Sequence, residues 1–280
     1  MAVAGFSGAG KTTCLTSLAH ELMTDGTGVA YMALETPARR VRAMFSALRL
    51  GYNYNFLIDG TYKGQKNWSE IKDRVLRDME SVAGGVYPLH VVEAPRLSAD
   101  DLPGVMGAAA QAGAKFMILD HIDHLASGQN AYQESRRAVD TLLDVAQDLH
   151  LSVLFATQTN NDSVRGNPLL QCYPPTPEMV YMGAHKRFVV SKFLGLYTPA
   201  RRDATREELQ EVKERRAPVS TILEAGVMGL ATMKDRFARR EGMRDRLTVH
   251  NGRVYDIPKD QRQALYGYDS GGETREQFTR

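Results

Sequence analysis

The 280-residue chain is long enough to bury a sizeable core, and its hydrophobic share of 43% and charged share of 24% are ordinary for one large α/β domain. Its net charge of +2 implies no particular partner, and its two cysteines, Cys14 and Cys172, have no metal-ligand spacing. Apolar runs stay well short of the roughly 18 residues of a membrane span, and the N-terminus has no signal-peptide pattern. We therefore expect a cytoplasmic protein without membrane segments.

Short apolar runs alternate with amphipathic stretches along the first part of the chain. Expected strands are 1–5, 28–34, 86–92, 115–120 and 151–157, and expected helices are 11–24, 37–49, 68–82, 99–112 and 131–149. This alternation predicts an α/β fold with a mainly parallel central sheet flanked by helices on both faces.

Two segments interrupt the alternation and predict loops. Residues 52–66 are polar and aromatic, and residues 159–178 are rich in asparagine and proline. Further on, 201–216 is expected to be a charged helix that begins with a capping box of Thr205 and Glu208. We expect residues 1–257 to form the domain and 258–280 a polar, frayed tail.

The clearest chemical signal is G-F-S-G-A-G-K-T at 5–12, which fits a P-loop between a predicted strand and a predicted helix. A chance glycine-rich turn is the alternative. In a P-loop, the glycines let backbone N–H groups surround phosphates, while Lys11 reaches the β- and γ-phosphates and Thr12 holds Mg²⁺. The predicted nucleotide-binding residues are Gly5, Ser7, Gly8, Ala9, Gly10, Lys11, Thr12 and Thr13.

Two acidic residues at strand ends complete the predicted site. Asp120 ends the apolar run 116–120. Beside Thr12, it is the second residue expected to hold the metal ion bound to the nucleotide. The neighbouring His121, Asp123 and His124 suggest either a separate metal site or groups that orient water or contact a neighbouring subunit. Glu35 ends the strand 28–34, where a carboxylate can accept a proton from the attacking water; an acid that caps the following helix is the alternative.

The ordered set of motifs resembles the ATPase domain of DnaB-like replicative helicases. The motifs here are the P-loop, L-E at 34–35, L-D-H-I at 119–122 and A-T-Q-T-N at 156–160. The L-D-H-I sequence is most similar to that in the helicase half of phage primase–helicases. The resemblance covers 1–160 and 177–256. It implies a RecA-like P-loop fold, ATP and Mg²⁺ as cofactors, Glu35 as catalytic base and Gln158 as sensor of the γ-phosphate.

The same resemblance extends to K-D-R-F at 234–237 and to a closing hairpin at 249–255. It implies that Arg236, assisted by Lys234, reaches the ATP site of a neighbouring subunit in a ring, expected to be a hexamer. An exposed basic strand edge is the alternative interpretation of this pair.

Contact with single-stranded DNA is expected from the loops at 126–137 and 159–187, which face the central channel in that family. Their basic side chains could follow a phosphate backbone, or they could be ordinary surface charge. The candidate residues are Arg136, Arg137, Arg165, Lys186 and Arg187.

Some features depart from the family. Helicases of this kind carry strands and a linker helix ahead of the P-loop, so the chain is either a fragment or assembles through another surface. The stretch 182–186 lacks much of the sequence that is usual in the family, and the charged insert at 201–216 does not resemble the family. These departures concern ring formation and unwinding and leave the ATP chemistry intact.

The leading functional hypothesis is an ATP-hydrolysing motor that translocates on single-stranded DNA and unwinds duplex DNA in replication, with a primase or loader as a further partner. A RecA-like recombination or repair ATPase without unwinding is the second hypothesis. A nucleotide-dependent regulatory binding module and a small-molecule kinase remain as alternatives.

Overall fold

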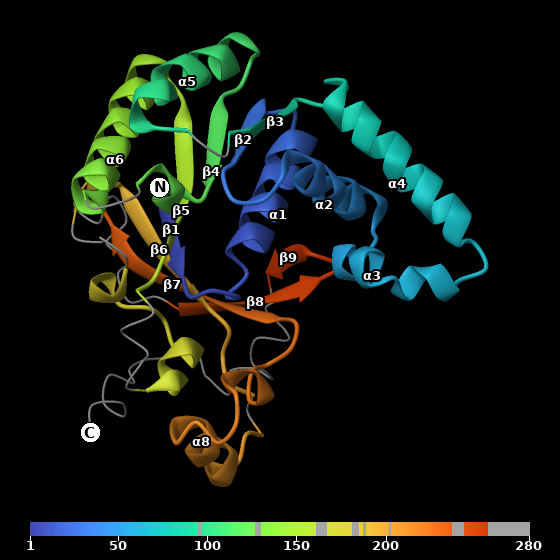
Figure 1. The fold of residues 1–280 in the computed structure, drawn as a ribbon, viewed down its shortest axis with the longest axis vertical. Coiled ribbons are helices and arrows are strands. Elements are labelled where there is room, and N and C mark those ends of the chain that lie inside the picture. Colours follow the sequence, from blue (N-terminus) through green and yellow to red (C-terminus); the bar gives the residue numbers. More distant parts are fainter. Residues whose placement is uncertain are drawn as a thin grey trace, which may run out of the picture.

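A nine-stranded sheet forms the centre of the computed structural model, in the order β3-β2-β4-β5-β1-β6-β7-β8-β9 (Figure 1). The structure describes residues 1–94, 97–126, 130–160, 167–180, 185–186, 189–201, 203–236 and 244–256. Strands from β3 to β6 pair in parallel, and strands from β6 to β9 pair antiparallel. The predicted α/β fold with a mainly parallel sheet is confirmed.

Each strand and helix expected up to residue 157 is present, with bounds that shift by a few residues. The strands are β1 (Ala2–Gly5), β2 (Val29–Ala33), β3 (Leu89–Glu93), β4 (Phe116–Asp120), β5 (Ser152–Gln158), β6 (Lys192–Tyr197), β7 (Val227–Asp235), β8 (Arg244–His250) and β9 (Arg253–Asp256). The α-helices are α1 (Lys11–Thr24), α2 (Ala38–Leu50), α3 (Tyr54–Asp59), α4 (Trp68–Ala83), α5 (Leu102–Gln111), α6 (Ala131–Asp148) and α8 (Arg206–Lys213). Within the described ranges, no helix is long and apolar enough to cross a membrane.

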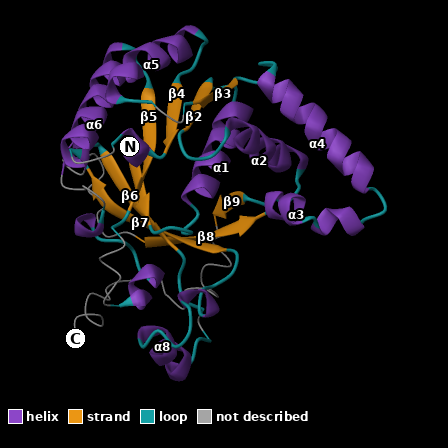
Figure 2. Cartoon of the chain, viewed as in Figure 1, coloured by secondary structure: helices purple, strands orange, loops and turns teal. Residues whose placement is uncertain are grey.

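Helices cover both faces of the parallel part of the sheet (Figure 2). On one face, Ala30 and Met32 of β2 join a buried cluster with residues of α5 and α6. On the other face, Tyr31 of β2 joins a second cluster with Leu15 of α1 and Phe45 of α2. Because β2 is buried on both sides, its sequence is a continuous apolar run rather than an alternating one.

The segment 52–66 contains α3 and a 3-10 turn at Thr61–Gly64, so the prediction of a loop there is wrong. The Asn53 side chain caps α3 by accepting a hydrogen bond from the Asn55 backbone N–H at 3.0 Å. Gly60, with φ 82°, ends the helix in the left-handed region that favours glycine. A helix this short shows no helical periodicity, which explains why the pattern missed it.

The hairpin of β8 and β9 packs on α1, as the expected closing hairpin. The Val254 backbone N–H donates to Ser17 Oγ at 3.0 Å, and Arg253 Nε donates to Glu21 at 2.8 Å. At the tip of the hairpin, Asn251 Nδ2 donates to the carbonyl oxygen of Gly51 at 3.0 Å. The hairpin thereby joins the C-terminal part of the sheet to α1 and to the end of α2.

The charged insert folds as the shorter helix α8, and its predicted capping box is confirmed. Thr205 Oγ1 accepts from the Glu208 backbone N–H at 3.2 Å, while Glu208 Oε2 accepts from the Thr205 backbone N–H at 2.7 Å. Val212 of α8 is fully buried in a small separate cluster with Cys172 and Ile222. The expected tail, 258–280, lies outside the described residues.

Candidate nucleotide-binding site

The carboxyl ends of β1, β2, β4 and β5 meet at one edge of the sheet. In the parallel register, Gly5 pairs with Gln158 and Ala33 pairs with Asp120. The Glu35 backbone N–H lies 3.4 Å from the carbonyl oxygen of Asp120. The structure thus brings the P-loop, Glu35, Asp120 and Gln158 to the same edge, where ligands bind in open α/β sheets.

The P-loop residues 5–12 turn directly from β1 into α1. Gly8 and Gly10 have φ values of 79° and 85°, in the left-handed region, where a side chain would strain the turn. The N-terminus of α1 has no side-chain cap and no acidic residue in its first turn. Its backbone N–H groups are therefore available to an anion, which is the arrangement that binds phosphate.

Lys11 lies inside this turn. Its Nζ donates to the carbonyl oxygens of Gly5 at 2.9 Å and Phe6 at 3.1 Å. Burial lowers the pKa of Lys11, whereas the negative charges of Asp120, Asp123 and Glu35 oppose that shift. Backbone carbonyls are neutral acceptors, so they satisfy the Lys11 ammonium only in part. A bound phosphate group would give it an anionic partner.

Asp120 is buried at the end of β4 and accepts a hydrogen bond from Tyr31 Oη at 2.8 Å. Burial, followed by the charge of Asp120, raises the pKa of Tyr31, so its hydroxyl remains a donor. The Asp120 carboxylate and the Thr12 hydroxyl are hard oxygen ligands, which is the chemistry that Mg²⁺ prefers. Tyr31 was missed by the sequence analysis because it lies within an apolar strand.

Asp123 connects three segments around this edge. Its carboxylate accepts from Thr157 Oγ1 at 3.0 Å and from the Gln158 backbone N–H at 2.7 Å. It also accepts from Lys186 Nζ, which in turn lies 3.0 Å from Thr157 Oγ1. Asp123 therefore fixes the end of β5, including the backbone of Gln158, to the segment that carries Lys186.

Lys186 does not occupy the exposed position expected of a DNA-contacting residue. Its side chain is only 1% exposed, and its ammonium group forms an ion pair with Asp123. A long cation without a nearby acid would not remain buried, so the pair determines where this side chain lies. The prediction of a DNA contact at Lys186 is replaced by a structural role behind Gln158.

Two histidines and Glu35 lie near the Gln158 side chain. His121 is 3% exposed, and its Nε2 contacts the Gln158 side-chain amide. Burial lowers the pKa of His121, and the charges of Asp123 and Asp120 oppose that shift. His124 is half-exposed, and its Nε2 lies 4.0 Å from Glu35 Oε2. Glu35 is the most accessible of this group, with a side chain 56% exposed.

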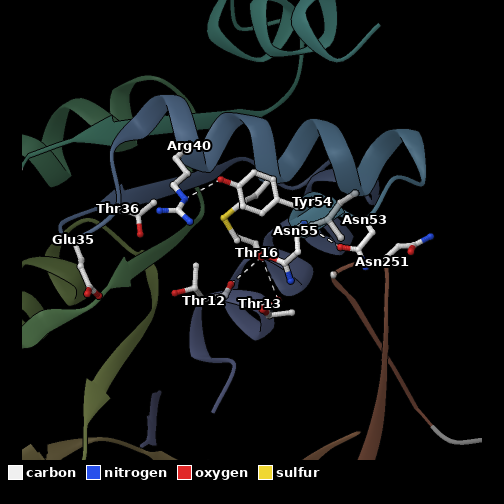
Figure 3. Close-up of a pocket in the computed structure, with 13 residues that line it drawn as sticks. Thr12, Thr13, Thr16, Glu35, Thr36, Arg40, Asn53, Tyr54, Asn55 and Asn251 are labelled. Atoms are coloured by element: carbon white, nitrogen blue, oxygen red, sulfur yellow. Dashed lines mark hydrogen bonds between the residues drawn. The ribbon is translucent and has the colours of Figure 1, made fainter. Parts of the chain in front are cut away.

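Glu35 lies between two cavities. One, of about 320 Å³, runs from Glu35 past Thr12 and Thr13 to Asn251 of the hairpin. Figure 3 shows Thr12, Thr13 and Thr16 along one side of it, with Arg40 and Tyr54 opposite. The other, of about 370 Å³, is lined by Glu35, His121, Asp123, His124, Gln158, Thr159 and Asn160.

The wall of the first cavity opposite Thr12 and Thr13 has side chains suited to a nucleobase. Arg40 Nε donates to Tyr54 Oη at 2.9 Å, and its guanidinium lies 6.0 Å from the centre of the Tyr54 ring (Figure 3). Planar cations and aromatic rings stack on bases, and the amides of Asn53, Asn55 and Asn251 nearby can hydrogen-bond base edges. The sequence pattern did not indicate these residues, mainly because 52–66 has the composition of a loop.

The remaining predicted DNA contacts are placed only in part. Arg136 and Arg137 are exposed on the first turns of α6, where they pair with Asp140 and Asp100 respectively. Arg165 and Arg187 lie outside the described residues.

The proposed finger residues lie far from this chain's own P-loop. Lys234 is in β7, and Arg236 follows its end, where the preceding Asp235 pairs with Lys192 at the start of β6. Because β6 runs parallel to β1, the end of β7 is at the sheet edge opposite to the carboxyl end of β1. Arg236 is exposed at that opposite edge.

Comparisons with known proteins identify the family and the fold of the chain. The model of the ATPase family associated with various cellular activities (AAA) matches residues 1–172. No curated protein sequence matches the chain. Among solved structures, a DnaB-like replicative helicase, described with its primase interactions, has a TM-score of 0.68 at 10% identity, over 92% of this chain and 57% of that one.

Two further structures share the fold. A second solved structure, described as an ATPase domain, has a TM-score of 0.68 at 10% identity, over 92% of this chain and 84% of that one. A KaiC-like protein from Pyrococcus horikoshii OT3 has a TM-score of 0.57 at 12% identity, over 92% of this chain and 88% of that one. At these identities the likeness establishes the RecA-like fold, as the motifs predicted. The match spans little more than half the length of the DnaB-like helicase.

Replacing Tyr31 with phenylalanine tests the support of Asp120. The loss of the only side-chain donor that the described structure shows for this carboxylate should lower the free energy of unfolding by about 1–3 kcal/mol. Urea unfolding followed by circular dichroism measures the change. Tyr132→Phe, at an exposed position, is the control and should leave stability unchanged; equal stability in both variants would contradict the role of Tyr31.

Replacing Lys186 with methionine tests the buried ion pair. The variant leaves Asp123 without its cation, so we expect a loss of about 3–5 kcal/mol in the free energy of unfolding. The control is Arg136→Met, which removes an exposed ion pair with Asp140 and should cost about 0.5 kcal/mol. Denaturant midpoints that fall equally in the two variants would exclude a structural role specific to Lys186.

Proposed function

Since the chain belongs to the ATPase family associated with various cellular activities, we propose that it is an ATP-hydrolysing motor that translocates on single-stranded DNA and unwinds duplex DNA during replication. The observation that carries the proposal is the convergence of Lys11, Glu35, Asp120 and Gln158 on one sheet edge. The fold shared with a DnaB-like replicative helicase supports the choice of motor.

Hydrolysis needs a base, positive charge that stabilises the phosphates in the transition state, and a binding site for the phosphates. The P-loop N–H groups would bind the phosphates, and Lys11 would exchange its carbonyl contacts for phosphate oxygens. Thr12 and Asp120 would hold Mg²⁺, which neutralises charge on the β- and γ-phosphates when bound. Glu35, accessible beside the cavity, would accept the proton of the water that attacks the γ-phosphorus, leaving ADP and inorganic phosphate.

Gln158 is the proposed link between hydrolysis and DNA. Its backbone is held by Asp123, while its side chain reaches His121 near the proposed γ-phosphate position. Lys186 ties the same Asp123 to the segment expected to face DNA. Loss of the γ-phosphate would therefore change the partners of Gln158 at a point that is mechanically joined to this segment. The proposed phosphate contacts remain Arg136, Arg137, Arg165 and Arg187.

The position of Arg236 supports the proposed assembly into a ring, expected to be a hexamer. A side chain at the edge opposite to the P-loop cannot stabilise the γ-phosphate of its own subunit. In a ring, that edge would face the ATP site of a neighbour, and Arg236 with Lys234 would complete it. A primase or loader is a further proposed partner, supported by the primase interactions described for the DnaB-like helicase.

Replacing Glu35 with glutamine should separate ATP binding from hydrolysis. Without the base, steady-state ATPase activity in the presence of single-stranded DNA should fall about 100- to 10,000-fold, while binding of a fluorescent ATP analogue stays unchanged. Glu93→Gln, at the exposed end of β3 on the same sheet edge, is the matched control. A wild-type ATPase that does not respond to single-stranded DNA would instead favour the regulatory module.

Mixing two inactive variants tests whether Arg236 acts between subunits. Arg236→Ala alone should lower DNA-stimulated ATPase activity about 1,000-fold or more. Mixed with Glu35→Gln, it should recover part of the activity, because some interfaces then combine an intact Glu35 with an intact Arg236. Arg216→Ala, an exposed arginine on the insert, is the control and should stay active alone. Without any recovery on mixing, a finger supplied by a neighbour is ruled out.

A further inference from the structure

Three potential metal ligands gather beside the second cavity. Glu35 follows β2, and His121 and His124 follow β4, so the parallel pairing of these strands brings them together. Each offers one ligand atom, and these atoms all lie within 4.8 Å of one another. The rings of His121 and His124 have their centres 4.4 Å apart.

The chemistry of this set favours a transition-metal dication. Two imidazoles and a carboxylate are typical ligands of Zn²⁺ and Co²⁺, whereas Mg²⁺ prefers oxygen ligands alone. Ligand atoms about 2.0–2.1 Å from a tetrahedral Zn²⁺ lie about 3.3 Å apart, so the set must contract slightly. The partly exposed side chains of Glu35 and His124 have room to make that movement.

A second observation concerns His121. The residue is only 3% exposed, yet its Nδ1 has no hydrogen-bond partner in the described structure. Buried ring nitrogens are normally paired, so His121 keeps one nitrogen that no group of the described structure satisfies. The adjoining cavity of about 370 Å³ has room for an ion and its water ligands.

We propose that Glu35, His121 and His124 form a binding site for a Zn²⁺-like dication, with water completing its coordination. The site is separate from the Mg²⁺ position proposed at Thr12 and Asp120. An ion bound there would occupy the Glu35 carboxylate and withdraw it from proton transfer, so metal binding and hydrolysis would compete for one side chain. The binding site itself does not depend on the proposed function.

Titration of the untagged, nucleotide-free protein with Co²⁺ tests the site, in a buffer with excess Mg²⁺ to fill hard-oxygen positions. The visible absorption of Co²⁺ reports nitrogen-containing tetrahedral coordination, and calorimetry gives the affinity. We expect a single Co²⁺ per chain, displaced by Zn²⁺. His124→Ala and Glu35→Gln should each weaken binding about tenfold or more.

The matched control is His250→Ala, which removes an exposed histidine of β8 outside the cluster and should bind Co²⁺ like the wild type. Circular dichroism confirms that each variant is folded. Equal Co²⁺ affinity in the wild type and in folded His124→Ala, or no stoichiometric binding by the wild type, would overturn the proposal. Because no nucleotide is present, either result leaves the proposed ATPase activity to its own tests.

Discussion

The parallel pairing of β1, β2, β4 and β5 is the constraint on which the site depends. Each of these strands ends at the same sheet edge, so residues from distant parts of the sequence meet at the strand ends. The helices on both faces bury these strands and fix their register, since a slip would expose apolar side chains and bury polar ones. Precise placement of Glu35 and Asp120 is thus a consequence of core packing.

Asp123 links the end of β5 to the later segment that carries Lys186. A carboxylate that accepts from Thr157, Gln158 and Lys186 is well satisfied despite its burial, which offsets much of the cost of removing it from water. The same contacts leave the Gln158 side chain, rather than its backbone, as the part that can change partners. The sensor role proposed for Gln158 would need this combination of a fixed backbone and a movable amide.

Much of the fold and part of the site could be predicted from the sequence, for a physical reason. The P-loop, Glu35 and Asp120 lie directly after apolar strands, and their spacing follows from local geometry. Tyr31 could not be found in this way, because an aromatic residue in a buried strand normally indicates core packing. Lys186 was misplaced for a related reason: its burial depends on an acid 63 positions away, which no local pattern encodes.

The positions of Glu35 and Arg236 explain why the proposed reaction would need two subunits. Glu35 stands at the edge that carries the P-loop and lines both cavities. The described residues that line the second cavity include no arginine, and the arginine of the first cavity, Arg40, donates to Tyr54. Arg236 stands at the opposite edge, away from the P-loop of its own subunit. Neighbouring copies stacked edge to edge would bring the two together. Hydrolysis would then depend on assembly, and in the proposed ring each site would be completed by a neighbouring subunit.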